Sequence, residues 1–162
     1  MKDRVNGNLG DTRSPSSRSA DGRSPRDRVL TSKPPLVIAD DNPIIMDLLA
    51  RLLEGRFDVV ARVGTGRALV EAVVRLSPAV VLTDIAMPEL NGIEAVRQIT
   101  ATYPAVKAVI CSVHDDPTFI EAAFEAGASA YIVKSGASAD IISAIEDVLA
   151  GRMRQPDAPQ NR

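Results

Sequence analysis

Five short apolar runs of strand type alternate with segments of helical periodicity between residues 34 and 150. The runs lie at residues 36–39, 57–61, 79–82, 106–111 and 130–133, and each is followed by apolar residues at helical spacing. Strands that are apolar along their whole length, each followed by a helix, are typical of a parallel sheet with helices on both faces. The sequence therefore predicts an α/β fold of (βα)5 order, with a doubly wound, five-stranded parallel sheet.

The ends of the helices are also marked locally. Asn42 precedes Pro43 and Asp116 precedes Pro117, which is the pattern of an N-cap followed by proline at the first helical position. Gly55 follows the first helical segment and is a typical C-terminal stop. In sheets of this type, functional residues lie beyond the carboxyl ends of the strands.

Charge and composition exclude several classes of protein. The net charge of −2 combines a basic segment 1–33 of net +4, an acidic centre 34–150 of net −8 and a basic segment 151–162 of net +2. An acidic centre is a poor non-specific binder of nucleic acid, whose phosphates attract Lys and Arg. The single cysteine, Cys111, excludes an internal disulfide, and its apolar neighbours predict a buried, inert thiol. No apolar stretch approaches the ~20 residues of a membrane-spanning helix, so we expect a cytoplasmic protein without membrane contact.

Composition further predicts the organisation of the chain. Residues 1–33 are rich in Ser, Arg, Asp, Gly and Pro and poor in apolar side chains, so we expect a disordered basic tail. Residues 34–150 are expected to form the folded domain. Residues 151–162 are expected to form a frayed C-terminal tail that is too short for an output domain, which predicts a stand-alone domain.

Five polar residues follow four of the predicted strands. They are Asp40 and Asp41 after the first strand, Asp84 after the third, Ser112 after the fourth and Lys134 after the fifth. Taken singly, each has an ordinary explanation as a helix cap, a turn residue or a solvated charge. Gathered at one edge, three repelling carboxylates suit a hard divalent cation such as Mg²⁺, while the ammonium and the hydroxyl suit a phosphoryl group. A carboxylate can also be the nucleophile and give an aspartyl-phosphate.

Six motifs follow one another along residues 34–150. They are Ile38-Ala39-Asp40-Asp41-Asn42-Pro43, Val81-Leu82-Thr83-Asp84-Ile85-Ala86-Met87-Pro88, Asn91-Gly92-Ile93-Glu94-Ala95, Val109-Ile110-Cys111-Ser112-Val113-His114-Asp115-Asp116, Ala126-Gly127-Ala128 and Tyr131-Ile132-Val133-Lys134. In this order and spacing they resemble the receiver domain of two-component response regulators. The resemblance is closest to receivers that precede a LuxR-type helix-turn-helix, and it implies the flavodoxin-like receiver fold.

The resemblance implies an acceptor and a metal site. Asp84 would accept a phosphoryl group from a histidine kinase or a histidine phosphotransfer protein. Asp40 and Asp41 would hold Mg²⁺ together with Asp84, and the backbone carbonyl of Ala86 would complete the protein ligands.

The resemblance also implies roles around the phosphoryl group. Ser112 would hydrogen-bond the phosphoryl oxygens, and Lys134 would pair with them. Tyr131 matches a switch aromatic that turns inward when Ser112 moves toward the phosphate, so that phosphorylation would change a protein-interaction surface. His114 and Val113 would line the rim, where His114 would affect dephosphorylation and Val113 would narrow access to the acceptor.

Two functions remain open for such a domain. The leading prediction is a single-domain response regulator that contacts a downstream protein when phosphorylated, with a homodimer on phosphorylation as an option. The alternative is a phosphorelay intermediate or phosphate sink that passes the phosphoryl group to a phosphotransfer protein. An aspartyl-phosphate enzyme of another α/β fold would need a second catalytic Asp two residues after Asp84, where this chain has Ala86. We therefore expect a protein that assists its own phosphorylation and dephosphorylation, is not an enzyme, and does not bind DNA directly.

Overall fold

The structure, a computed structural model, describes residues 32–134 and 138–156. The chain divides into Met1–Ser32 and Lys33–Arg162, and the description below concerns the second of these units. Residues 1–31 of the predicted disordered tail and residues 157–162 of the predicted C-terminal tail lie outside the described residues.

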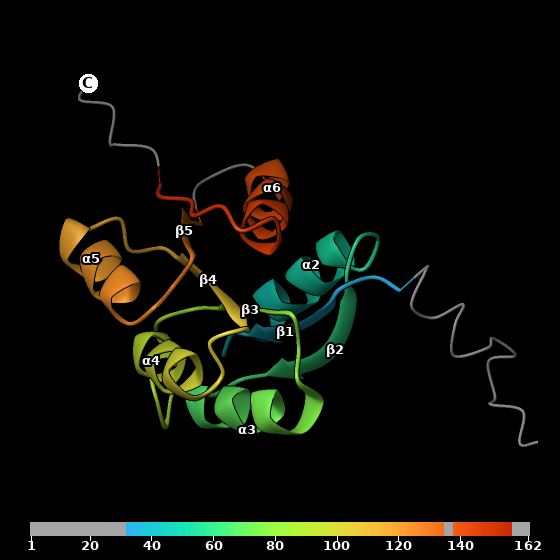
Figure 1. Ribbon diagram of the computed structural model, residues 1–162, viewed down its shortest axis with the longest axis horizontal. Coiled ribbons are helices and arrows are strands. Elements are labelled where there is room, and N and C mark those ends of the chain that lie inside the picture. Colours follow the sequence, from blue (N-terminus) through green and yellow to red (C-terminus); the bar gives the residue numbers. More distant parts are fainter. Residues whose placement is uncertain (1–31, 135–137, 157–162) are drawn as a thin grey trace, which may run out of the picture. The chain divides into compact units, whose positions relative to one another are not determined.

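A sheet of five parallel strands forms the centre of the fold (Figure 1). The strands are β1 (Pro35–Ala39), β2 (Asp58–Val63), β3 (Val80–Thr83), β4 (Lys107–Ser112) and β5 (Ala130–Val133), in the order β2-β1-β3-β4-β5. The chain adds β2 on one side of β1 and then β3, β4 and β5 on the other side. The strand order therefore reverses between β1 and β3, which is where sheets of this type bind ligands. The predicted fold is confirmed.

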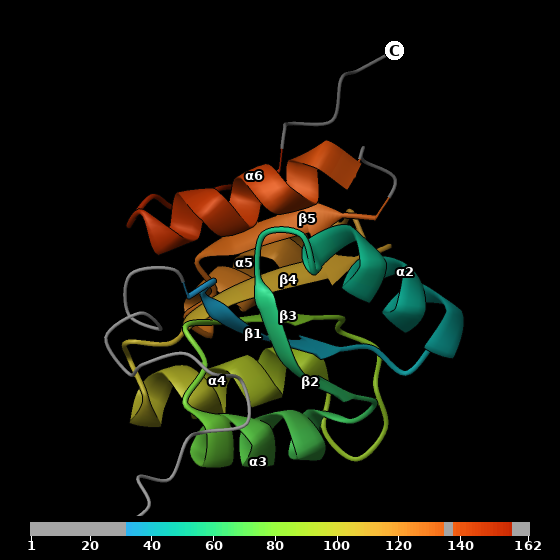
Figure 2. The same ribbon diagram turned by 90° about the vertical axis from the view of Figure 1, so that its right-hand side faces the viewer.

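Helices cover both faces of the sheet (Figures 1 and 2). The helices α2 (Pro43–Leu53) and α6 (Ser138–Leu149) pack on one face, and α3 (Gly66–Leu76), α4 (Gly92–Thr102) and α5 (Pro117–Glu125) pack on the other. Side chains of β1 alternate between the two layers: Leu36 and Ile38 belong to the first, Val37 and Ala39 to the second. Because the strand is buried on both faces, all four positions are apolar, which explains the uninterrupted run in the sequence.

The predicted helix caps lie at the strand ends that matter for the site. The Asn42 side chain accepts hydrogen bonds from the backbone N–H groups of Ile44 and Ile45, at 3.0 and 3.4 Å. The Asp116 side chain accepts one from the N–H of Thr118 at 2.7 Å. Each cap satisfies donors that the first helical turn leaves unpaired, and so fixes how the chain leaves the sheet.

Two glycines bring the loop between β3 and α4 very close to its neighbours. The Gly92 N–H donates to the Ile85 carbonyl at 2.9 Å, and a Cβ at Gly92 would overlap the Asp84 carbonyl oxygen. At the start of α3, a Cβ at Gly66 would overlap the Leu90 carbonyl oxygen. A larger residue at either position would force the backbone of the loop to move. The loop is therefore packed tightly at both of its ends, against Gly92 at Asp84 and against Gly66 at Leu90.

The prediction of a frayed C-terminal tail is wrong for the described residues 152–156. Gly151 has a φ of +84°, a conformation that favours glycine, and the chain turns back onto the sheet. Arg154 then forms a parallel bridge with Ala130 of β5. Composition pointed to fraying because this segment has few apolar residues, but the bridge uses backbone groups that every non-proline residue carries.

Candidate functional site

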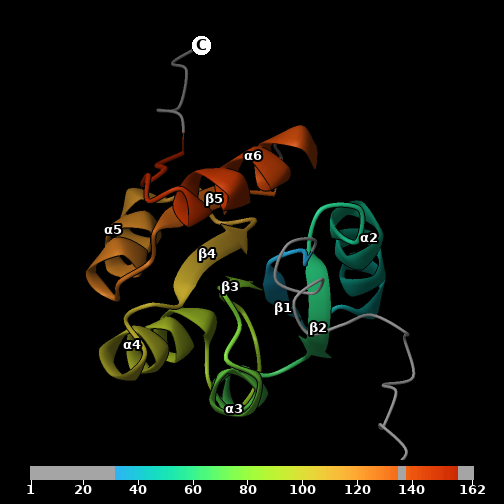
Figure 3. The same ribbon diagram turned by 45° about the vertical axis from the view of Figure 1, so that its right-hand side comes forward.

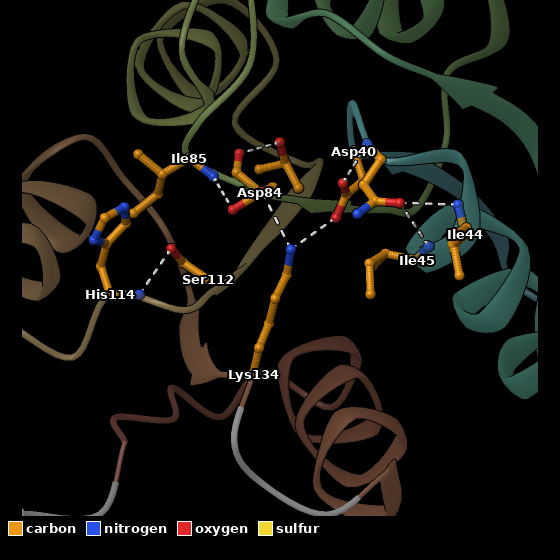
Figure 4. Close-up of polar contacts among 10 residues, drawn as sticks. Asp40, Ile44, Ile45, Asp84, Ile85, Ser112, His114 and Lys134 are labelled. Atoms are coloured by element: carbon orange, nitrogen blue, oxygen red, sulfur yellow. Dashed lines mark hydrogen bonds and ion pairs between the residues drawn. The ribbon is translucent and has the colours of Figure 1, made fainter.

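A lysine and two aspartates that directly follow three different strands meet at the carboxyl edge of the sheet (Figure 4). The Lys134 Nζ donates to Asp40 Oδ2 at 2.8 Å and to Asp84 Oδ2 at 3.1 Å. The side chain of Asp40 is 1% exposed, that of Asp84 is 11% exposed and that of Lys134 is 17% exposed. The parallel topology therefore brings these residues together from distant parts of the sequence, and the ion pairs lie largely out of solvent.

Asp41 completes a cluster of three carboxylates. One oxygen from each of Asp40, Asp41 and Asp84 lies within 4.8 Å of the other two. Asp40 is buried, Asp84 is partly buried and Asp41 is exposed, so the cluster opens toward solvent on the Asp41 side. Mg²⁺ prefers carboxylate oxygens and keeps several waters, so this donor set and its open side fit Mg²⁺. Ala86 is exposed in the loop after Asp84, and the role of its carbonyl as a ligand stays a prediction.

Backbone donors orient two of the carboxylates. Asp40 Oδ1 accepts a hydrogen bond from the Asn42 N–H at 2.9 Å. Asp84 Oδ1 accepts one from the Ile85 N–H at 2.7 Å. In both residues the other oxygen faces Lys134, so each carboxylate is fixed by two charge-assisted hydrogen bonds.

The charges of the cluster are only partly balanced. Burial alone would lower the pKa of the Lys134 ammonium, but its hydrogen bonds and charge interactions with Asp40 and Asp84 outweigh burial and raise that pKa above its usual value. Lys134 is therefore charged at neutral pH. One positive charge faces three carboxylates, and a divalent cation would balance the remainder.

Ser112, His114 and Tyr131 form a chain of hydrogen bonds beside this cluster. Ser112 is fully buried at the end of β4, and its Oγ accepts a hydrogen bond from the His114 N–H at 3.2 Å. The Tyr131 hydroxyl donates to the His114 carbonyl at 2.6 Å. Tyr131 is 1% exposed, and burial raises the pKa of its phenol. The residue predicted as a switch aromatic thus lies inward and is bonded to the loop that follows Ser112.

Phe119 is a contact of the site that the sequence did not reveal. The His114 ring stacks on the ring of Phe119 in α5, with centroids 4.6 Å apart and planes inclined by 24°. The available signal was an aromatic residue in the first turn of the helix after the His114 loop. Val113 is 67% exposed, so its side chain projects into solvent. The proposed effects of Val113 on access and of His114 on dephosphorylation stay predictions.

Comparison with known proteins identifies the family. Residues 36–146 match the family model of the response regulator receiver domain. The chain belongs to this family. The resemblance recognised in the sequence is thereby confirmed, as is phosphoacceptor signalling in two-component systems as the function of the receiver family.

Curated relatives give the same result. The chain is 36% identical over 127 residues to the transcriptional regulatory protein DegU of Brevibacillus brevis, covering 77% of this chain and 54% of that protein. It is 31% identical over 114 residues to the chemotaxis protein CheY of Thermotoga maritima, covering 70% of this chain and 95% of that protein. The chain spans about half the length of DegU and of other regulatory proteins that it matches.

Solved structures agree with the fold. A LuxR-family two-component response regulator from Aurantimonas sp. SI85-9A1 superposes with a TM-score of 0.73 at 34% identity, covering 76% of this chain and 89% of that one. The signal receiver domain of the NarL response regulator from Mycobacterium tuberculosis superposes with a TM-score of 0.72 at 27% identity, covering 75% and 100%.

None of the helices in residues 32–134 and 138–156 is both long enough and apolar enough to span a membrane.

Proposed function

We propose that Asp84 is the phosphoryl acceptor of this receiver domain and that Asp40 and Asp41 form its Mg²⁺ site together with Asp84. The observation that carries the proposal is the position of Lys134, whose ammonium contacts both Asp40 and Asp84 at the edge of the sheet. A nucleophilic carboxylate beside an ammonium and two further carboxylates is the set of groups that phosphoryl transfer needs.

The residues divide the chemistry between them. The Asp84 carboxylate attacks the phosphorus of a phosphohistidine, a P–O bond forms, and the P–N bond to the histidine breaks. Lys134 pairs with the phosphoryl oxygens, and the Ser112 hydroxyl donates a hydrogen bond to one of them. When bound by the three aspartates and the Ala86 carbonyl, Mg²⁺ would neutralise charge on the phosphoryl oxygens. Catalysis here is positioning and charge balance, so the domain assists its own phosphorylation and dephosphorylation without being an enzyme.

The partners follow from this chemistry. The phosphoryl donor is a histidine kinase or a histidine phosphotransfer protein. The phosphorylated domain then contacts a downstream protein, and formation of a homodimer on phosphorylation is a further output. No direct DNA contact is proposed for the acidic segment 34–150. We further propose that residues 34–150 form the receiver domain and that segments 1–33 and 151–162 flank it in the sequence.

The test is phosphorylation by a small donor. Acetyl phosphate with Mg²⁺ is expected to add one phosphoryl group to the wild-type chain, detected by intact-mass spectrometry, and none to Asp84→Asn. Asp115→Asn is the matched control, because Asp115 is an exposed aspartate outside the carboxylate cluster. Equal labelling of Asp84→Asn and Asp115→Asn would exclude Asp84 as the acceptor. Labelling that persists in excess EDTA would exclude the proposed metal site.

The alternative function, a phosphorelay intermediate or phosphate sink, can be distinguished from a regulator by whether the labelled phosphoryl group is transferred. A phosphorelay intermediate or phosphate sink passes its phosphoryl group to a phosphotransfer protein, whereas a regulator with a protein target keeps it. Mixing the labelled chain with candidate phosphotransfer proteins and following the label decides between the two.

A further inference from the structure

The chain forms an additional edge of the sheet after α6 (Figures 1 and 3). The Arg154 N–H donates to the Ser129 carbonyl at 2.9 Å, and the Tyr131 N–H donates to the Arg154 carbonyl at 3.1 Å. These two bonds make the parallel bridge to Ala130 on the outer side of β5. We call residues 152–155 the strap.

Charged side chains fasten the strap to α6. Arg152 donates to Asp147 Oδ1 from both Nε and Nη2, at 3.1 and 2.6 Å. The Arg154 guanidinium donates to Ser143 Oγ at 2.7 Å and forms ion pairs with Asp147 and Asp140 at 3.5 and 3.7 Å. The hydrogen bond from Arg152 is the main cause of a lowered pKa of the Asp147 carboxyl.

The interactions that hold the strap on α6 are weak enough to break reversibly. The guanidinium of Arg152 and the carboxylate of Asp140 are both largely exposed, so solvent and salt screen these ion pairs. Among the described residues the strap adds one bridge to the sheet, and no large apolar side chain of residues 152–155 is buried. A segment held in this way can open without unfolding the domain.

The strap connects directly to the phosphoryl site through Tyr131. Its backbone carbonyl at Arg154 accepts from the Tyr131 amide, and the hydroxyl of the same tyrosine donates to the His114 carbonyl at 2.6 Å. The His114 amide then donates to Ser112 Oγ at 3.2 Å. Three hydrogen bonds, joined by the covalent frames of Tyr131 and His114, therefore link the strap to the hydroxyl that is proposed to contact the phosphoryl group.

We propose that the strap reports the state of the phosphoryl site: closure of the strap on β5 and occupation of Asp84 by a phosphoryl group stabilise each other through Tyr131. The inference rests on the proposed function. In this structure the closed strap occurs together with a buried, hydrogen-bonded Tyr131. A phosphoryl oxygen that accepts from Ser112 holds the Ser112–His114 segment in place, which keeps Tyr131 inward and its amide aligned with the strap. Coupling of two sites is reciprocal, so an opened strap must weaken phosphoryl binding by the same factor.

A simpler role for the strap makes a different prediction. Edge strands are commonly covered to prevent pairing with other chains, and residues 152–155 could serve β5 in that way alone. A passive cover would not respond to the phosphoryl site, so the response of the strap separates the two roles.

The first experiment measures amide hydrogen exchange in the wild-type chain by NMR. Beryllofluoride with Mg²⁺ serves as the phosphoryl mimic, and exchange of the Tyr131 and Arg154 amides is compared with and without it. We expect both amides to exchange about five-fold or more slowly when the mimic is bound, a factor in the usual range of coupling between sites. Unchanged exchange in a chain that acetyl phosphate labels on Asp84 would overturn the strap inference and leave the proposed function standing. Absence of any labelling would overturn the proposed function itself.

The second experiment opens the strap and measures the site. Arg154→Pro removes the N–H that donates to Ser129 and is expected to weaken the affinity for beryllofluoride with Mg²⁺ by the factor that exchange gives. Arg56→Ala is the matched control, because Arg56 pairs with Glu146 of α6 at 2.7 Å and has no contact with the strap. Equal affinities of Arg154→Pro and wild type would refute the coupling. The exchange experiment needs no variant and decides the question even if Arg154→Pro does not fold.

Discussion

Replacing Lys134 by Met tests whether this lysine holds the carboxylate cluster together. Methionine keeps an unbranched side chain of similar length but removes the ammonium that contacts Asp40 and Asp84. Both carboxylates then face each other with little solvent, because their side chains are 1% and 11% exposed. Without a cation, only the backbone N–H groups of Asn42 and Ile85 oppose the repulsion between the two carboxylates.

The cost follows from the burial of the site. Removing one partner of a buried ion pair costs about 3–5 kcal/mol, because the other charge is left without compensation. The open side near Asp41 lets water reach the cluster, so the lower limit applies and we expect a loss of about 3 kcal/mol. For a domain of this size the loss corresponds to a fall in melting temperature of roughly 10 °C.

Magnesium should reduce this loss. A cation bound by Asp40, Asp41 and Asp84 supplies the positive charge that the variant lacks, and binding to the folded state alone contributes about 2.7 kcal/mol at a hundred-fold excess over the dissociation constant. In the wild type, the Lys134 ammonium would compete with the metal for the carboxylates of Asp40 and Asp84, whereas the variant lacks this competitor. The variant should therefore gain more stability from Mg²⁺ than the wild type gains.

The assay is urea unfolding followed by circular dichroism at pH 7, in EDTA and in excess Mg²⁺. Lys33→Met is the control, because the Lys33 ammonium donates to the Glu54 carbonyl at an exposed position, where the change is expected to stay within about 0.5 kcal/mol. A loss below about 1 kcal/mol for Lys134→Met in EDTA, or an equal loss in EDTA and Mg²⁺, would refute the reasoning.

Three further predictions concern single residues. Burial raises the pKa of the Cys111 thiol to about 11, so roughly one molecule in a thousand carries a thiolate at pH 8. Ellman's reagent should therefore modify Cys111 only when the protein unfolds. Modification of the native protein at the rate of free cysteine would contradict this prediction. Gly66→Ala should lower the free energy of unfolding, measured in urea, by about 2–4 kcal/mol, because the added Cβ would overlap the loop backbone. Gly55→Ala is the control: Gly55 has open space around it, so this change should alter the free energy of unfolding by no more than about 0.5 kcal/mol. Equal effects of the two changes would contradict the close packing at Gly66. Tyr131→Phe should cost about 1–3 kcal/mol in the same assay, because the His114 carbonyl loses its donor, and a neutral result would show that this acceptor is solvated.

The sequence predicted the fold well because its signals are local. Strands are marked by continuous apolar runs, and helix starts are marked by the Asn42 and Asp116 caps and the proline after each. These signals are complete within a few consecutive residues. Boundaries were less accurate where pairing decides them: the second strand was predicted at residues 57–61 but runs as Asp58–Val63, since its ladder with β1 continues to Ala39. Hydrogen bonding across the sheet leaves no periodic trace in one strand alone.

The composition of the site was predictable from topology, but its contacts were not. The rule that parallel strands end at one edge placed Asp40, Asp84 and Lys134 together without any knowledge of distances. That Lys134 contacts both carboxylates, or that His114 stacks on Phe119, depends on side-chain packing between distant segments. The strap was missed for the same reason, because its bridge joins backbone groups 24 positions apart in a polar segment.

Charge balance connects the geometry of the cluster with its proposed chemistry. Three carboxylates and one ammonium give a net charge of −2 where an anionic phosphoryl donor would have to approach. Repulsion would hold the donor away, and the ammonium of Lys134 is already engaged by Asp40 and Asp84. A divalent cation on the aspartates would remove the excess charge and take over the role of Lys134 toward them. Lys134 then becomes available to the phosphoryl oxygens, so the dependence on metal and the function of the lysine are two aspects of one electrostatic requirement.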